Sequence, residues 1–288
     1  MIVSVRRGRS SDAGIVGEIC YKAFKALSEE HNFLPDFPNA EVATQALGML
    51  LTHERIFDVV AEVNEQVVGS NFLDERNPIS GLGPITVDPT CQNEGVGHVL
   101  MQAVMDRSAE RGFAGIRLVQ AAYHRRSLAM YIKLGFEVRE LLACVQAPPA
   151  TSTATVLPGF TVRPATADDV PACNRLCFQI HGHDRNGELA DAVAQGAARA
   201  VERMGRLTGY ASPVAFFGHA VGETNDDLKA LIGAAVSIPG PGALIPASNT
   251  ELMRWCLARG MRVTQTMTLM TQGLYNRPAG AWLPSVIY

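Results

Sequence analysis

The chain has 288 residues, of which 47% are hydrophobic and 18% are charged. This length predicts two domains of about 140 residues, each large enough to bury a core of its own. The formal net charge of −3 provides no basic field of the kind that holds a protein on nucleic acid, so we expect no nucleic-acid partner.

The beginning of the chain does not resemble a signal peptide, because Arg6, Arg7 and Arg9 follow a very short apolar run with no hydrophobic region behind them. The longest charge-free windows, 141–162 and 230–250, contain several prolines or hydroxyl residues and are not expected to span a bilayer. We therefore expect a cytoplasmic protein without a membrane partner. The six cysteines form no CxxC pair, which favours reduced, mostly buried thiols and predicts no metal site.

Hydrophobic periodicity in the first half alternates between helix and strand. Apolar residues in the stretch 12–24 lie on one helical face, and Asn64-Glu65 separates two β-rich runs as a hairpin turn would. The expected elements, in chain order, are a strand at 2–6, helices from 12 and at 41–52, strands at 57–63, 66–73 and 82–87, a helix from 96, a strand at 116–121, a helix at 124–134 and a final strand. This order predicts a mixed α/β layered domain.

The periodic pattern stops around 146–158, where proline, serine and threonine dominate as in a linker. We therefore expect a first domain at 1–147, a linker at 148–159 and a second domain at 160–288.

The second half repeats parts of the first. Val162, Arg163 and Asp169 match Val5, Arg6 and Asp12 at an offset of 157. Near the end of each half, the stretch 257–263 resembles 132–138 at an offset of 125, so the second copy is 32 residues shorter between its two echoes. Two copies predict a pair of related domains and not a repeating stack, although chance similarity over so few positions is the alternative.

The stretch 85–97 reads as a strand, a short turn and the start of a helix. Helix N-termini carry unpaired amides and the positive end of the helix dipole, so a diphosphate binds there if side chains leave room. Gly95 and Gly97 leave that room, Gln92 adds a polar side chain at the entrance, and the amides of 93–98 can form an anion-binding nest. The alternative is an ordinary turn that needs glycine for a positive φ.

Two motifs together resemble the signatures of the GNAT superfamily of acetyl-CoA-dependent N-acetyltransferases. Gln92-x-x-Gly95-x-Gly97 after Val87-Asp-Pro resembles the pyrophosphate loop of that superfamily, and Tyr131 followed by Gly135-Phe136 resembles its second signature. The resemblance covers residues 1–145. With the motif-poor second half, it implies an α/β fold with two GNAT-like mixed-sheet domains in tandem, the second shorter and lacking the pyrophosphate loop.

The resemblance also implies roles for individual residues. The Tyr131 hydroxyl would protonate the departing thiolate, unless its ring only packs against the sheet, and a main-chain N–H of the preceding strand, that of Val87, would stabilise the oxyanion. His124 stands where the family often has asparagine, and Ser127 lies one turn before the tyrosine. The residues expected to contact acetyl-CoA are Ile85, Thr86, Val87, Gln92, Asn93, Glu94, Gly95, Val96, Gly97, His98, His124, Ser127 and Tyr131.

No motif identifies a general base. Glu75, at the end of the third expected strand, is the preferred candidate, although an ordinary surface carboxylate would look the same and deprotonation through water would need no base. Glu30, His31 and Asp36 lie in the connecting stretch that would shape the acceptor pocket. The second half has Asn249 and Cys256 at the positions that echo His124 and Tyr131, which predicts a non-catalytic domain.

The sequence therefore predicts an enzyme that moves an acetyl group from acetyl-CoA to a primary amine of a small molecule or peptide, without a metal. The alternative is a regulatory protein that binds acyl-CoA and transfers nothing, and a third reading is a structural protein without a ligand. A homodimer is expected only because it is the commonest assembly.

Overall fold

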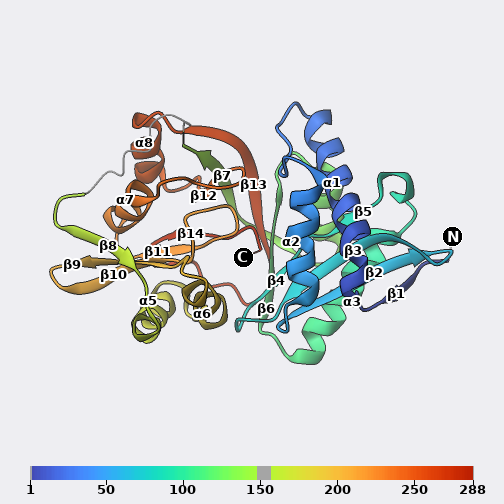
Figure 1. Cartoon of the computed structure of the whole chain (residues 1–288), viewed down its shortest axis with the longest axis horizontal. Helices are drawn as coiled ribbons and strands as arrows, with labels where there is room; N and C mark the ends of the chain where they lie inside the picture. Colours follow the sequence, from blue (N-terminus) through green and yellow to red (C-terminus); the bar gives the residue numbers. More distant parts are fainter. Residues whose placement is uncertain (1, 148–156, 288) are drawn as a thin grey trace.

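The computed structural model describes residues 2–147 and 157–287 and contains two β-sheets (Figure 1). The larger sheet has the strand order β1 (Ser4–Arg6), β2 (Ile56–Val63), β3 (Gln66–Asp74), β4 (Ser80–Leu82), β6 (Gly115–Ala121), β13 (Arg262–Gly273), β7 (Glu137–Gln146) and β12 (Ala243–Pro246), while β5 (Thr86–Val87) pairs with β3. The smaller sheet has the order β14 (Ala281–Leu283), β11 (Ala220–Gly222), β10 (Arg206–Ala211), β9 (Arg199–Arg203) and β8 (Phe160–Pro164). The larger sheet is mixed, because β4 and β6 are parallel, whereas the strand pairs of the smaller sheet are antiparallel throughout the described residues. Together with the helices, the two sheets confirm the α/β class.

Helices cover both faces of the first sheet. Along β2, Ile56 and Val60 pack on the first two helices, while the alternate residues Val59 and Ala61 pack on the third, as the period of two in a strand requires. The helices are α1 (Ala13–Glu30), α2 (Ala40–Thr52), α3 (Val96–Arg111), α4 (Arg125–Lys133), α5 (Val170–His181), α6 (Asn186–Ala194), α7 (Asn225–Ala234) and α8 (Thr250–Ala258). The sheet of the first half is therefore a layer between two helical layers.

The two halves share their last strands. Strand β13 of the second half lies between β6 and β7 of the first, and β7 pairs on its other edge with β12 of the second half. In Figure 1 the long strands β7 and β13 run through the middle of the molecule and join its two sides. The larger sheet is thus continuous across both halves of the sequence.

Both echoes in the sequence fall on matching structures. Arg6 binds Asp12 and Glu62, and Arg163 binds Asp169 and Glu202 in the same way, each arginine lying on the first strand of its half. The residues before α4 and α8 also have nearly the same backbone angles, φ −82° and ψ 74° against φ −84° and ψ 68°. The chain contains two copies of one arrangement.

Two turns in the first half show how local sequence determines the strands. Asn64 and Glu65 have φ of 49° and 64° and close the β2–β3 hairpin as a primed turn does. The expected strand 82–87 is instead two short strands, β4 and β5, because Gly83 (φ 121°) and Pro84 interrupt it and proline has no N–H to pair with a neighbour.

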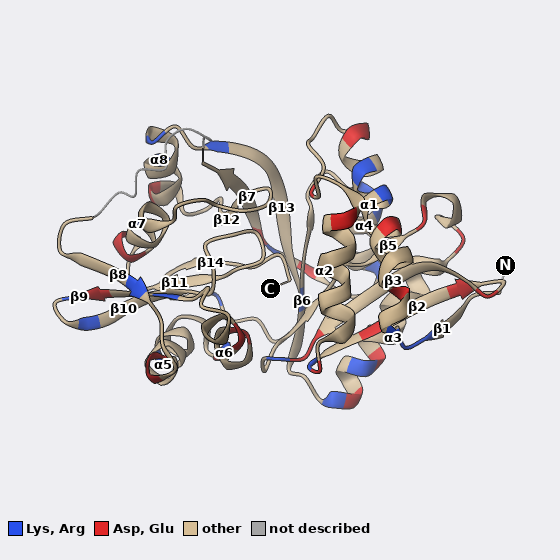
Figure 2. Ribbon diagram, in the orientation of Figure 1, with Lys and Arg blue, Asp and Glu red and all other residues tan. Residues whose placement is uncertain are grey.

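Acidic and basic residues are interspersed on both sides of the molecule in Figure 2. None of the helices in the described part of the chain combines the length and hydrophobicity that crossing a bilayer requires.

Candidate functional site

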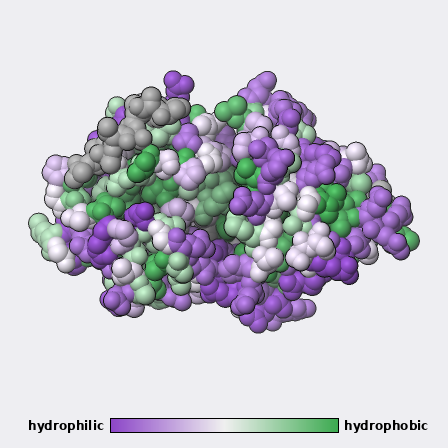
Figure 3. Space-filling view, viewed as in Figure 1, coloured by the Kyte–Doolittle hydropathy of each residue, from purple (hydrophilic) through white to green (hydrophobic). Residues whose placement is uncertain are grey.

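A cavity of about 790 Å³ lies between the two halves and is lined by residues from both. Its walls come from α1, α2, β5, the loop before α3, β6 and α4 of the first half, and from α6 and the stretches 212–217 and 286–287 of the second. In the space-filling view of Figure 3, hydrophobic residues gather around the recess between the two sides. The cavity is large enough for a sizeable ligand, and most of its wall is apolar.

One wall of the cavity is the loop that enters α3. After the single 3-10 turn Pro89–Cys91, Asn93 has φ 67° and Gly95 has φ 86°, so the backbone turns sharply and α3 begins at Val96. A Cβ at Gly95 would meet nothing within 4 Å, whereas its positive φ makes glycine the natural residue there. Conformation, and not crowding, explains this glycine.

The amides at the start of α3 are open. The helix has no side-chain cap, and Val99 is the first residue whose amide donates back to the turn, to the Gly95 carbonyl at 3.2 Å. Among the described residues, no hydrogen bond from the amides of 93–98 to an acceptor outside the helix is found. Gln92, Asn93, Gly95, Gly97 and His98 all line the cavity. The amides of 93–98, called the cradle below, face the cavity in an arrangement that can bind an anion.

A gap between β5 and β6 forms the next part of the wall. β4 pairs with β6 in parallel, but β5 pairs with β3 only, so the edge of β5 that faces β6 is free in the described chain. The Asp88 amide donates to Val68 of β3 at 2.8 Å, and by strand alternation the polar backbone groups of Val87 point the other way. Consistent with this direction, Gln92 Nε2 donates to the Val87 carbonyl at 3.3 Å. The Val87 N–H therefore points into the gap, which Ile85 and Thr86 also line.

Tyr131 of α4 lies at the end of this gap. Its ring is only 4% exposed and packs edge-on against Phe136, with centroids 6.0 Å apart, yet the residue also lines the cavity. Burial raises the pKa of Tyr131 to about 12, although a hydrogen bond with Ser127, which also lines the cavity, lowers it. The ring of Tyr131 thus packs in the core, while its hydroxyl stays protonated and the residue borders the cavity.

His124 precedes α4 and lines the same cavity without capping the helix. Burial, followed by the neighbouring Arg126, lowers the pKa of His124, so the imidazole is neutral near pH 7. Arg126 in turn donates to Asn93 Oδ1 at 3.4 Å and joins α4 to the loop before α3. Two uncapped helix starts and a guanidinium therefore border the cradle.

Three of the predicted residues do not line the cavity by their side chains. Glu94 and Val96 belong to the cradle through their backbone only, and Val96 is buried in the core. Glu75 lies elsewhere: its carboxylate accepts from Arg107 Nε at 2.6 Å and lies 3.7 Å from Arg111. The two arginines hold the carboxylate away from the cavity, so its position does not suit the general base that we expected.

Gln120 of β6 is a cavity residue that the sequence reasoning missed. It is 6% exposed, and neither Oε1 nor Nε2 has a hydrogen-bond partner in the described chain. By strand alternation it shares a face with Leu118, which packs with Tyr131 and α3. A glutamine at an inward position of an otherwise apolar strand was the available signal, because a buried amide needs partners.

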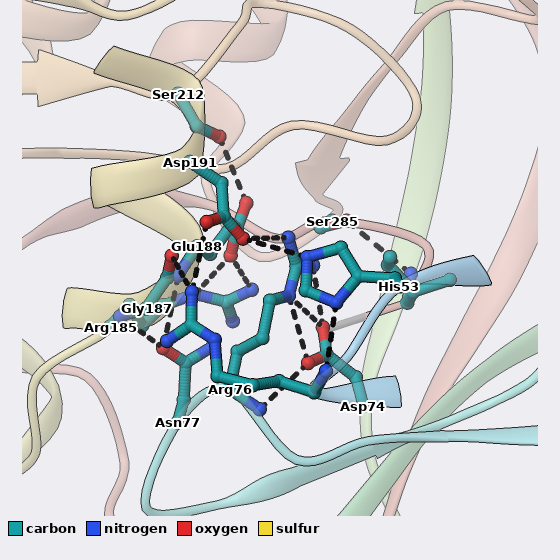
Figure 4. A network of polar contacts seen from close by, with 12 residues as sticks. His53, Asp74, Arg76, Asn77, Arg185, Gly187, Glu188, Asp191, Ser212 and Ser285 are labelled. Atoms are coloured by element: carbon teal, nitrogen blue, oxygen red, sulfur yellow. Dashed lines mark hydrogen bonds and ion pairs between the residues drawn. The ribbon is translucent and has the colours of Figure 1, made fainter. Parts of the chain in front are cut away.

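A polar network joins the halves at the far wall of the cavity (Figure 4). Asp191 of α6 accepts from Arg76 at 3.1 Å, from Arg55 at 2.8 Å and from His53 at 3.2 Å, and Arg76 also holds Asp74. His53, Arg76 and Asp191 line the cavity, so this network fixes the distance between its two walls.

A second, buried network adjoins that wall and includes His219, while its members Glu188 and Ser212 line the cavity. Glu188 accepts from Arg185 and from Ser212 at 2.9 Å, and lies 3.0 Å from His219 Nδ1, whose other nitrogen meets the Tyr210 hydroxyl at 2.9 Å. All five side chains are at most 5% exposed. Every group in this network has a protein partner, which is typical of a structural core network.

The matching place in the second half is closed. At the start of α7, Thr224 donates its amide (2.8 Å) and its hydroxyl (2.9 Å) to Asp227, which occupies the cap. Asn249 caps α8 by accepting from the Leu252 amide at 3.2 Å, whereas His124 leaves α4 uncapped. Cys256 is fully buried. Helix starts that are open in the first half are capped by protein in the second.

The described residues contain no group of three or more His, Cys, Asp or Glu side chains arranged to hold a metal ion.

Comparisons with known proteins include a family model that matches part of the first half and solved structures that match nearly the whole chain. Residues 22–136 match the family model of the acetyltransferase (GNAT) family. A Pyrococcus horikoshii protein described provisionally as an acetyltransferase has a TM-score of 0.73 at 15% identity, covering 94% of this chain and 89% of that one. A GCN5-related N-acetyltransferase from Sphaerobacter thermophilus has a TM-score of 0.62 at 12% identity, covering 96% of each chain. A tandem GNAT protein from the clavulanic acid biosynthesis pathway has 0.55 at 13%, covering 94% and 98%. Comparison with curated proteins by sequence finds no match.

Proposed function

We propose, from the match of residues 22–136 to the acetyltransferase (GNAT) family model, that the chain moves an acetyl group from acetyl-CoA to the primary amine of a small molecule or peptide. The observation that carries the proposal is the open start of α3, where the amides of 93–98 face the cavity and have no partner outside the helix within residues 2–147 and 157–287. An uncapped helix start beside a cavity suits a diphosphate, which brings two adjacent negative charges.

In this proposal the rest of acetyl-CoA extends from the cradle into the gap between β5 and β6. The free edge of β5, with Thr86 and Val87, would pair with the amides of the pantetheine arm as a neighbouring strand would. The unpartnered amide of Gln120, on the β6 side of the gap, provides a donor and an acceptor for the same arm. We include Gln120 with Ser127 and His124 among the cofactor-binding residues.

The acetyl carbon would then lie near the Val87 N–H and the Tyr131 hydroxyl. When the amine attacks, a C–N bond forms and the carbonyl oxygen becomes an oxyanion, which the Val87 N–H stabilises. As the C–S bond breaks, the sulfur takes the proton of Tyr131, whose pKa of about 12 keeps the phenol protonated in neutral solution. The phenolate regains its proton from the new amide nitrogen.

Binding and turnover are tested separately. Added CoA at 100 times its dissociation constant should stabilise the protein by about 2.7 kcal/mol, measured by denaturation. Replacing Tyr131 by phenylalanine should leave CoA affinity unchanged and reduce thiol release with an accepted amine by about 10²- to 10⁴-fold, the range of general acid catalysis. Phe136→Leu, which alters the packing partner of Tyr131 and leaves the hydroxyl in place, is the control.

Two results would contradict the proposal in different ways. Stabilisation by CoA without acetylation of any amine would indicate a regulatory acyl-CoA-binding protein, and no stabilisation by CoA would remove the cradle as a ligand site.

A further inference from the structure

The cavity continues beyond the β5–β6 gap into a chamber that both halves of the chain enclose. On one side, Phe24 of α1 and Phe37 stack with their ring centroids 6.3 Å apart. On the other side lie Phe216 and Val286, which are joined by a hydrogen bond from the Val286 amide to the Phe216 carbonyl at 2.9 Å. All four residues line the cavity. The chamber therefore presents aromatic and aliphatic surface from two directions.

Asp36 introduces a charge into this apolar chamber. Gln265 Nε2 donates to its Oδ1 at 3.1 Å, while in the described structure Oδ2 accepts no hydrogen bond and the carboxylate has no ion-pair partner. Burial raises the pKa of Asp36 above its ordinary value, and the Gln265 bond partly offsets this effect. A carboxylate in such surroundings is stabilised by a cationic ligand.

The carboxylate is held in place by a chain of contacts. The Tyr123 hydroxyl donates to Gln265 Oε1 at 3.2 Å, which turns the Gln265 amide toward Asp36. Tyr123 itself stacks on Phe33, with centroids 4.4 Å apart and an angle of 13°. Gln265 belongs to β13, the strand of the second half that lies between β6 and β7. The second half therefore also positions the Asp36 carboxylate of the first half.

Two other carboxylates that line the cavity are paired within the protein. Asp191 pairs with Arg76, Arg55 and His53, and Glu188 is bound by Arg185 and Ser212. A third, Glu30, is exposed to solvent. Among the described residues, Asp36 is therefore the carboxylate of the cavity that is partly shielded from solvent and has no ion-pair partner.

Resting on the acetyl transfer proposed above, we propose that the acceptor is a small primary amine with an apolar aryl or alkyl body, bound with its ammonium group on Asp36 and its body between Phe24, Phe37 and Phe216. A peptide suits the chamber poorly, because its backbone amides would be buried among apolar side chains without partners. A polyamine suits it poorly as well, because its second ammonium would lie either among apolar side chains or at the exposed Glu30, where an ion pair contributes little.

This assignment completes the proton balance of the reaction. The bound ammonium gives one proton to Asp36, which releases it to solvent, and the neutral nitrogen attacks the thioester carbon. The second proton leaves the nitrogen as the amide forms, and it replaces the proton that Tyr131 gives to the CoA sulfur. The net products are an N-acetylated amine, CoA thiol and one proton.

The test measures thiol release from acetyl-CoA with 2-phenylethylamine, spermidine and an alanyl tripeptide, beside CoA binding by calorimetry. We expect kcat/KM for 2-phenylethylamine to exceed the other two by at least about tenfold. Asp36→Asn, which can still accept from Gln265, should lower kcat/KM for 2-phenylethylamine at least about 30-fold and leave CoA affinity unchanged. Glu41→Gln, at an exposed carboxylate of α2 that does not line the cavity, is the control and should act as wild type.

An inhibition experiment on the wild-type protein keeps the test independent of how well a variant folds. Benzyltrimethylammonium, an apolar cation that cannot be acetylated, should compete with the amine, and the neutral 2-phenylethanol should not. Three results would overturn the inference: a preference for spermidine or the tripeptide, equal behaviour of Asp36→Asn and Glu41→Gln, or a preference for octanoyl-CoA, which would place an acyl chain in the chamber. Failure of CoA to bind would instead overturn the proposed function itself.

Discussion

Replacing Gly97 by alanine separates the stability of the fold from the binding of the cofactor. Gly97 is the second residue of α3, and a Cβ there would make ordinary contacts, 3.8 Å from Met130 Sδ and 3.9 Å from Val87 Cγ2. Since its backbone has no left-handed φ, alanine should raise the free energy of unfolding by up to about 1 kcal/mol through helix propensity. The change is expected to stabilise the free protein.

The same methyl group should weaken CoA binding. Val87 and Met130 both line the cavity, so the added carbon lies on the side from which a diphosphate would approach the amides. Loss of one charge-assisted hydrogen bond costs about 1.5–3 kcal/mol, so the dissociation constant for CoA should rise about 10- to 100-fold. Calorimetric titration with CoA and denaturation in urea measure the two effects on the same preparation.

A matched control exists in α1. Gly14 is also the second residue of its helix, and a Cβ there would meet nothing within 4 Å. Gly14→Ala should therefore raise stability to a similar extent and leave CoA affinity as in wild type. If Gly97→Ala bound CoA as tightly as Gly14→Ala does, the diphosphate would not lie against the start of α3, and the reasoning about the cradle would be refuted.

Two further predictions concern stability. Arg76→Met should lower the free energy of unfolding by about 3–5 kcal/mol, because it leaves the buried Asp74 without its ion-pair partner. The control Arg55→Met, at an exposed ion pair, should lower it by less than about 1 kcal/mol. Equal midpoints of urea denaturation for the two variants would contradict this prediction. Because burial raises the pKa of Tyr131 to about 12, the protonated phenol contributes fully to stability below pH 10, and this contribution is lost as the pH rises toward 12. The difference in free energy of unfolding between wild type and Tyr131→Phe should therefore fall by about 3 kcal/mol over that interval. A difference that stays constant with pH would show that the phenol is not buried when ionised.

The features that the sequence predicts well are those encoded by neighbouring residues. The loop at 92–97 and the Asn64-Glu65 turn are short stretches in which residue type determines backbone geometry. The break in the strand at 82–87 was also readable, because Gly83-Pro84 cannot continue a ladder, but the run of apolar residues around it concealed the signal.

The features that it does not predict depend on contacts between distant segments. Nothing local to β13 indicates that it lies between β6 and β7, since any apolar strand of the right length can pair there. The bond between Gln265 and Asp36 joins residues 229 positions apart and follows from that pairing alone. Glu75 was expected near the reaction because it ends a strand, but the two arginines of α3 that hold it became apparent only with the helix in place.

The two copies of the arrangement explain why the second half contributes to the cavity without a cradle of its own. Where α3 leaves its first amides open, α7 closes them with Thr224 and Asp227, and a helix start whose amides are satisfied has no affinity for a diphosphate. The second half instead contributes β13, Gln265 and the wall around Phe216 to the cavity of the first. If the first half were separated from the second, one edge of β6 would be exposed and one wall of the chamber would be lost. The insertion of β13 between β6 and β7 therefore makes the cavity depend on both halves.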